Sequence, residues 1–83
     1  MKRDLEEYCN IIGKRLASIR KQKGFNQKQI SDALREKGVI LSTSSISKIE
    51  NRTRKVSDIE VLVLSEVLNV SVDYLLNDEN AEI

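Results

Sequence analysis

The sequence predicts an all-α fold, a bundle of five helices in a single domain. Apolar residues recur at three- and four-residue spacing along most of the chain, and no segment shows the two-residue alternation of a strand. Val61 and Val63 come nearest to alternation, but the residues between and after them are leucines. The chain has no proline and 3 glycines, so Ser, Asn and Asp must mark most helix ends.

The first helix is expected from about Asp4 to Gln22. Apolar side chains recur along one of its faces, which indicates an amphipathic helix. Gly24 follows a lysine-rich last turn, as the C-terminal end of a helix favours. Residues 1–11 are then a helical N-terminal extension of a domain that spans residues 1–77.

The next two helices begin at residues suited to capping. Asn26 is placed to cap a second helix, which stops at Gly38, and Ser42 is placed to cap a third helix over residues 43–51. The segment between these two helices is a short apolar connector.

The last two helices have the same kind of start. Ser57 and Glu60 have the spacing of a capping box, which opens a fourth helix that ends near Leu68. Ser71 is placed to cap a short fifth helix. Residues 78–83 are expected to be a frayed acidic tail.

Composition limits the kinds of function. With 1 cysteine an internal disulfide is impossible, and without histidine the commonest general base and metal ligand are missing. No apolar run approaches the roughly 20 residues of a membrane span, and the N-terminus lacks the apolar stretch of a signal peptide. The chain is expected to be cytoplasmic and non-catalytic, with no metal, cofactor, membrane or evident small-molecule ligand.

Charge is sorted along the chain. All 14 Lys and Arg residues lie between Lys2 and Lys55, a stretch of net charge +8, while residues 56–83 carry −7. The total of +1 hides this separation. A basic half of this kind is expected to meet phosphate; the alternative is a solvated surface with unevenly placed charges.

Two groups of residues carry a resemblance. The first is Gln27-x-x-Ile30-Ser31, then Gly38, then Ser42-x-x-x-Ile46-Ser47-Lys48-Ile49-Glu50-Asn51. The second is Leu64-x-x-x-Leu68-Asn69-Val70-Ser71-Val72-Asp73-Tyr74-Leu75-Leu76. Over about residues 12–76 the chain resembles the phage-repressor and Cro-like (XRE-type) helix-turn-helix family.

That resemblance implies a lambda-repressor-like bundle in which the second and third helices form the helix-turn-helix. It also implies a sequence-specific transcriptional regulator, of repressor type, whose recognition helix (residues 43–51) lies in the major groove of double-stranded DNA. The chain departs from the family pattern at some positions. The span from Gln27 to Glu50 is several residues longer than usual, Ser31 and Ser65 replace alanines, and Arg52 replaces a glycine.

The resemblance also assigns the residues that would contact DNA. Base contacts are implied for Thr43, Ser44, Ser47 and Lys48. Phosphate contacts are implied for Gln27, Lys28, Asn51, Arg52, Arg54 and Lys55. Lys48 is the strongest candidate for a directional contact, because lysine donates to the O6 and N7 edge of guanine. The alternative is that the serines are ordinary N-terminal helix residues and that the loop is only solvated.

Two further roles follow from the resemblance. Arg20 and Glu50 match positions that form a partly buried salt bridge between the first helix and the end of the third, which makes them structural residues. Tyr74 is expected to bury its ring against the fourth helix, as the family's aromatic residue does.

The fourth helix is apolar on two sides. Its family-like buried positions are Val61, Leu64, Ser65 and Leu68. Ile59, Val63 and Val67 recur every four residues on roughly the opposite face. This second face is either the seam of a homodimer that reads palindromic half-sites, or it is covered by the N-terminal extension through Leu5, Tyr8 and Cys9.

A second class of function keeps the same fold but binds protein. In that interpretation the chain is an antitoxin-like or anti-regulator module. Its contact surface is then the acidic C-terminal half or the face formed by Ile59, Val63 and Val67.

Overall fold

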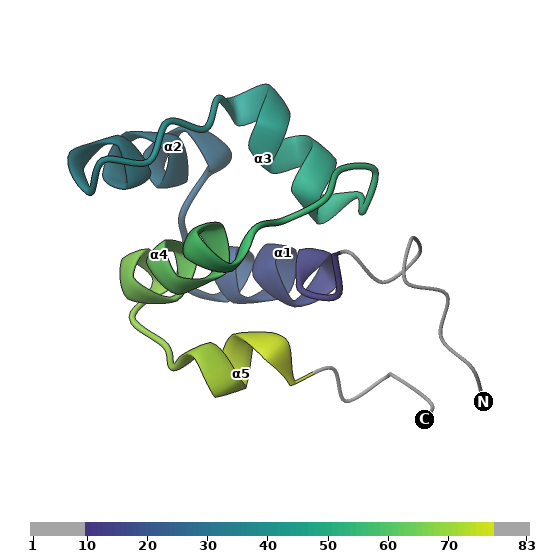
Figure 1. The fold of residues 1–83 in the computed structure, drawn as a ribbon. Coiled ribbons are helices and arrows are strands. Elements are labelled where there is room, and N and C mark those ends of the chain that lie inside the picture. Colours follow the sequence, from purple (N-terminus) through teal and green to yellow (C-terminus); the bar gives the residue numbers. More distant parts are fainter. Residues whose placement is uncertain (1–9, 78–83) are drawn as a thin grey trace.

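The computed structural model describes residues 10–77, which form five α-helices (Figure 1). They are α1 (Gly13–Gln22), α2 (Gln27–Glu36), α3 (Thr43–Glu50), α4 (Asp58–Leu68) and α5 (Val72–Leu76). No strand occurs within the described range. The prediction of an all-α fold with five helices is therefore confirmed.

Side-chain caps set the starts of α2, α3, α4 and α5. Each capping side chain accepts a hydrogen bond from the backbone N–H three positions later: Asn26, Ser42, Ser57 and Ser71. At α2 and α4 the cap is reciprocal, because Gln29 and Glu60 accept from the backbone N–H of the capping residue. These are the four caps predicted from the sequence. They could be predicted because an N-cap depends on residues only a few positions apart.

The start of α1 differs from the prediction. The helix begins at Gly13, and residues 10–12 are not helical, so it does not continue back towards Asp4 through them. Asn10 instead bonds through its side chain and its carbonyl to the end of α3 and the segment after it. The rest of the expected N-terminal extension, with Leu5, Tyr8 and Cys9, lies outside the described residues. So does the expected acidic tail (78–83).

The core joins all five helices. α1 packs against α3 and α5, α2 packs against α3 and α4, and α4 packs against α5. In the view of Figure 1, α3 lies above α1 and α4, and α5 lies below them. The buried apolar side chains of the core are Ile12, Leu16, Ile19, Ile30, Leu34, Leu41, Ile46, Ile49, Val63, Leu64, Leu68 and Leu75. The side of α3 that faces away from this core is open to solvent.

The long connector between α2 and α3 is held against α2. Gly38 turns the chain with φ 86°, a left-handed backbone that glycine adopts without strain. The hydroxyl of Ser31 donates to the carbonyl of Leu41 at 2.5 Å, and the Leu41 side chain is buried. Serine in place of the family's alanine therefore fixes the extra length of this turn, while Ile40 remains exposed.

Candidate nucleic-acid interface

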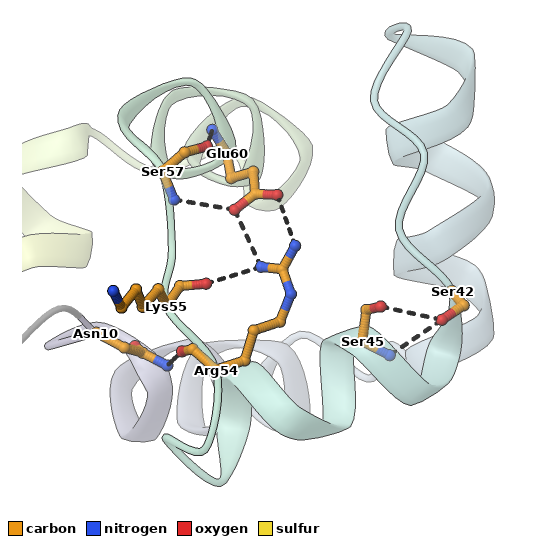
Figure 2. Close-up of polar contacts among 7 residues, drawn as sticks. All are labelled: Asn10, Ser42, Ser45, Arg54, Lys55, Ser57 and Glu60. Carbon is orange, nitrogen blue, oxygen red and sulfur yellow. Dashed lines mark hydrogen bonds and ion pairs between the residues drawn. The ribbon is translucent and has the colours of Figure 1, made fainter.

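Helix α3, the predicted recognition helix, has one apolar face and one polar face. Ile46 and Ile49 are both fully buried, so they fix the helix to the body of the domain. The N-cap Ser42 accepts from the backbone N–H of Ser45 at 3.0 Å and donates to the Ser45 hydroxyl at 3.1 Å (Figure 2). The Ser45 side chain is thereby bonded within the start of the helix.

The outward side chains of α3 are those predicted to contact bases. Thr43, Ser44 and Lys48 are exposed, and Ser47 is half-buried. A helix face of this kind has short hydroxyl side chains at its N-terminal end and one long cation a turn later. These groups can donate and accept hydrogen bonds at the edges of base pairs.

A partly buried ion pair fixes the C-terminal end of α3. Arg20 Nε lies 2.6 Å from Glu50 Oε2, and Arg20 Nη2 lies 3.1 Å from Glu50 Oε1. The two side chains are only 11% and 8% exposed. The hydrogen bonds to Glu50 raise the pKa of the Arg20 guanidinium. The predicted salt bridge between α1 and the end of α3 is thus present in the structure.

Gln27 joins this ion pair. Its side-chain Nε2 donates to Glu50 Oε1 at 3.1 Å from the first position of α2. One carboxylate therefore ties α1, α2 and α3 together, and it sets how the two helices of the helix-turn-helix cross. The phosphate contact predicted for Gln27 stays a prediction, and it has to be made by the groups of Gln27 that Glu50 does not use.

The basic loop, residues 52–55, follows α3 and is anchored at several points. Arg54 forms a two-bond ion pair with Glu60, Nη1 to Oε1 at 3.1 Å and Nη2 to Oε2 at 3.0 Å, and Nη1 also donates to the carbonyl of Lys55 at 2.9 Å (Figure 2). Arg54 is therefore bonded within the domain, and the phosphate contact predicted for it stays a prediction. The Lys55 side chain is exposed.

The other residues predicted to contact phosphate differ in their surroundings. Asn51, the C-cap of α3, is exposed. Lys28 is exposed and pairs with Asp32 one turn along α2, at 3.0 Å. An exposed pair of this kind contributes little to stability, so Lys28 can exchange its partner for a phosphate at small cost.

A family model described as helix-turn-helix matches residues 16–75, most of the chain. The chain belongs to this helix-turn-helix family. The family is the Cro/C1-like, XRE-type group of DNA-binding transcription regulators, and it is generally non-enzymatic. No curated protein and no solved structure matches the chain. Within residues 10–77, no helix is both long and apolar enough to cross a bilayer.

This helix-turn-helix domain departs from the family pattern after α3, where Arg52 stands in place of glycine. Arg52 adopts a left-handed backbone with φ 60°, so the usual helix ending forms without glycine. Its backbone N–H donates to the carbonyl of Ile49, and its side-chain Nε donates to the carbonyl of Asn10 at 3.0 Å. The contact with Asn10 offsets part of the strain of this backbone.

Tyr74 does not bury its ring against α4, so that expectation is wrong. The residue is exposed, and the guanidinium of Arg15 on α1 lies 4.1 Å from the centre of its ring. Arg15 Nε also donates to the Tyr74 carbonyl at 3.0 Å. The cation draws the ring to α1 because a guanidinium is attracted to an aromatic face.

The second apolar face of α4 also differs from the prediction. Val63 is only 6% exposed and belongs to the core, and Val67 is partly buried against it. The repeat at four-residue spacing places both towards the body of the domain, because α4 has neighbours on two sides, α2 and α5. The exposed apolar side chains of α4 are Ile59, at 53%, and Leu62.

Two residues near the site were not singled out from the sequence. Asn10 contacts the end of α3 and the basic loop, and Gly13 allows α1 to approach α3 closely. A glycine at the first position of a helix is a recognisable signal of close approach. No feature of the local sequence marks Asn10, because its partners lie about 40 residues later along the chain.

Proposed function

We propose that the chain is a sequence-specific transcriptional regulator that binds double-stranded DNA, with α3 in the major groove. The observation that carries the proposal is the outward polar face of α3, held by the buried Ile46 and Ile49 and by the Arg20–Glu50 pair. A recognition helix has to be rigidly attached on one side and open to base edges on the other.

Base contacts are proposed for Thr43, Ser44, Ser47 and Lys48. Lys48 donates to guanine O6 or N7 in this proposal. Thr43 and the two serines supply hydrogen bonds from shorter side chains. The Thr43 methyl can contact a thymine methyl. The exposure of Lys48 and Thr43 supports these roles.

Phosphate contacts are proposed on both sides of the recognition helix. Gln27 and Lys28 lie at the start of α2, where backbone N–H groups and the helix dipole attract an anion. Asn51, Arg52 and Lys55 grip the backbone beyond the other end of α3. Arg54 contributes mainly by holding the basic loop in place through Glu60.

The test starts with selection of bound duplexes from a random pool by the wild-type protein. Lys48→Ala is then compared with Lys23→Ala, which removes an exposed lysine beside α5, in a shallow groove with Val70 and Tyr74. We expect Lys48→Ala to lose preference at one base position, a cost of about 1–3 kcal/mol for the correct base. We expect Lys23→Ala to keep all preferences. Unchanged base preferences in Lys48→Ala would contradict the assignment.

A protein-binding function, antitoxin-like or anti-regulator, is the alternative. Its support is the exposed pair Ile59 and Leu62 on α4, a helix that carries three acidic residues and no basic one. A salt series separates the two functions, because binding to duplex DNA weakens steeply with salt. Absence of duplex binding at low salt would favour the protein partner.

A homodimer is proposed for operator binding, because two half-sites about 34 Å apart are read by two recognition helices. The seam was predicted at Ile59, Val63 and Val67. The exposed apolar residues of α4 that such a seam would use are Ile59 and Leu62. Sedimentation at micromolar concentration tests this, with Ile59→Glu as the variant and Ile40→Glu, which changes another exposed isoleucine, as the control. A dimer that only Ile59→Glu dissociates supports the seam, and a wild-type monomer rejects it.

A further inference from the structure

The end of the recognition helix and the basic loop are joined through one buried side chain, that of Asn10. Its Nδ2 donates to the carbonyl of Ile49 at 2.7 Å and to the carbonyl of Arg54 at 3.0 Å. The first carbonyl belongs to α3, and the second lies beyond its C-cap, inside the loop (Figure 2 shows the Arg54 contact). A single amide nitrogen therefore spans the exit of α3 and fixes the path of the chain there.

A reverse contact closes this arrangement. Arg52 Nε donates to the backbone carbonyl of Asn10 at 3.0 Å. The loop therefore also bonds to the backbone of Asn10. Asn10 is 5% exposed, which keeps water from competing for these bonds. The loop is thus bound at Arg52 and at Arg54 to the same residue.

Close packing makes the contact possible. A Cβ added at Gly13 would lie 2.3 Å from the carbonyl oxygen of Ile49 and 2.8 Å from Cγ of Arg52. The backbone at the start of α1 therefore touches the end of α3. Because the two backbones lie this close, the short side chain of Asn10 can reach the carbonyls of both Ile49 and Arg54.

The chemistry of Asn10 suits a residue that orients α3 and the basic loop better than one that only fills space in the core. Its Oδ1 is buried and has no hydrogen-bond partner among the described residues. An unpaired buried acceptor opposes folding, so an apolar side chain would fill the same space with less penalty. The group that the amide adds is a pair of directed N–H donors, and both are used on the recognition helix and its loop.

The other end of the loop is fixed independently. Glu60 accepts from both amino groups of Arg54 and from the backbone N–H of Ser57. Asn10 holds the carbonyl of Arg54, while Glu60 holds its guanidinium (Figure 2). The backbone and the side chain of Arg54 are thus held by two different residues, one before α1 and one on α4.

We propose that Asn10 is a positioning residue for DNA binding: it holds the basic loop at a fixed place beyond the recognition helix, so that the loop cations meet phosphate in register with the base contacts. Asn10 itself touches no DNA. The inference rests on the proposed function. It predicts that loss of Asn10 removes phosphate contacts of the loop and leaves the base contacts of α3 intact.

The experiment compares Asn10→Ala and Asn10→Ser with the wild-type protein on one selected duplex, between about 50 and about 200 mM salt. Each lost phosphate contact should lower the salt slope by about 0.9, equivalent to about 3.5-fold less change in Kd across that range. Base preference is measured in parallel with single-base variants of the duplex. The serine hydroxyl in Asn10→Ser is one bond shorter and has one proton, so it cannot bond both carbonyls. This variant should lower the slope as well, and its polar side chain keeps the experiment informative if Asn10→Ala fails to fold.

The matched control is Val70→Ala, which trims a partly buried residue between α4 and α5, away from the loop. It should lower the melting temperature while the salt slope keeps its wild-type value. We expect the Asn10 variants to lower the slope at temperatures where they are fully folded, with base preference unchanged.

Two other outcomes would overturn the inference, and they are distinguishable. Folded Asn10 variants with a wild-type slope would show that Asn10 only stabilises the fold, as Val70 does. A wild-type protein without salt-dependent duplex binding would reject the proposed function itself, and the positioning role with it.

Discussion

Arg20 on α1 and Glu50, the last residue of α3, face one another with two hydrogen bonds of 2.6 and 3.1 Å. Gln27 of α2 donates to the same carboxylate. The orientation of α3 is therefore set by one charged group at its C-terminal end and by the apolar side chains beneath it.

Glu50→Gln should destabilise the domain strongly. The substitution keeps the shape of the side chain but leaves the guanidinium of Arg20, 11% exposed, without its counter-charge. Breaking one partner of a buried pair costs up to about 3–5 kcal/mol. Urea denaturation of Glu50→Gln, Arg20→Met and the double variant measures the coupling. If the single losses simply add, the pair is not coupled and this interpretation is wrong.

Stability should fall in acid through the pair formed by Arg54 and Glu60. Hydrogen bonds from the Arg54 guanidinium, and to a smaller extent from Ser57, lower the pKa of Glu60 although its burial opposes the shift. A carboxylate whose pKa is lower in the folded state stabilises the fold above its unfolded pKa of about 4.3. That contribution is lost as the pH falls through the lowered value.

Glu60→Gln tests this pH dependence. The free energy of unfolding, measured in urea from neutral to acid pH, should decrease less on acidification in Glu60→Gln than in the wild-type protein. The Arg54 side chain is 31% exposed, so water screens the pair and the difference should be about 1 kcal/mol or less. Asp58→Asn, in the same first turn of α4, is the control. It keeps the pair of Arg54 and Glu60, so that pair's contribution to the acid dependence of the free energy of unfolding should be unchanged.

The cap signals could be predicted from the sequence because their partners are near neighbours in the chain. Ser57 finds Glu60 three residues on, and Asn26 finds Gln29 in the same way. The polar face of α3 was equally predictable, since helical spacing alone separates Lys48 from the buried side chains.

Contacts between distant elements could not be predicted in this way. Val63 lies opposite the expected buried face of α4, yet it is buried because α2 and α5 both pack on that helix. Tyr74 turns to Arg15, 59 residues earlier, and Asn10 bonds to carbonyls 39 and 44 residues later. Periodicity tells which side of a helix is apolar, but it does not tell how many neighbours the helix has.

Arg52→Gly should be more stable than Arg52→Ala. Both variants lose the contacts of the arginine side chain, including the bond to the carbonyl of Asn10. Alanine keeps the strain of a backbone with φ 60°, whereas glycine relieves it. The strain removed, about 1–2 kcal/mol, exceeds the extra entropy that glycine loses on folding, so a difference of about 1 kcal/mol is expected. Equal melting temperatures of the two variants would show that this backbone is not strained.

Gly13→Ala should destabilise the domain by about 1–3 kcal/mol, as overpacking in a closely packed region does. The added methyl would lie 2.3 Å from the carbonyl oxygen of Ile49, which is backbone and cannot move aside as a flexible side chain can. Ser18→Ala, at an exposed position of α1, is the matched control and should be neutral or slightly stabilising because alanine favours helices. Thermal unfolding of both variants decides the matter. A Gly13→Ala protein as stable as Ser18→Ala would mean that α1 and the end of α3 can separate without cost. The close approach at Gly13 would then not be needed to hold α3 in place.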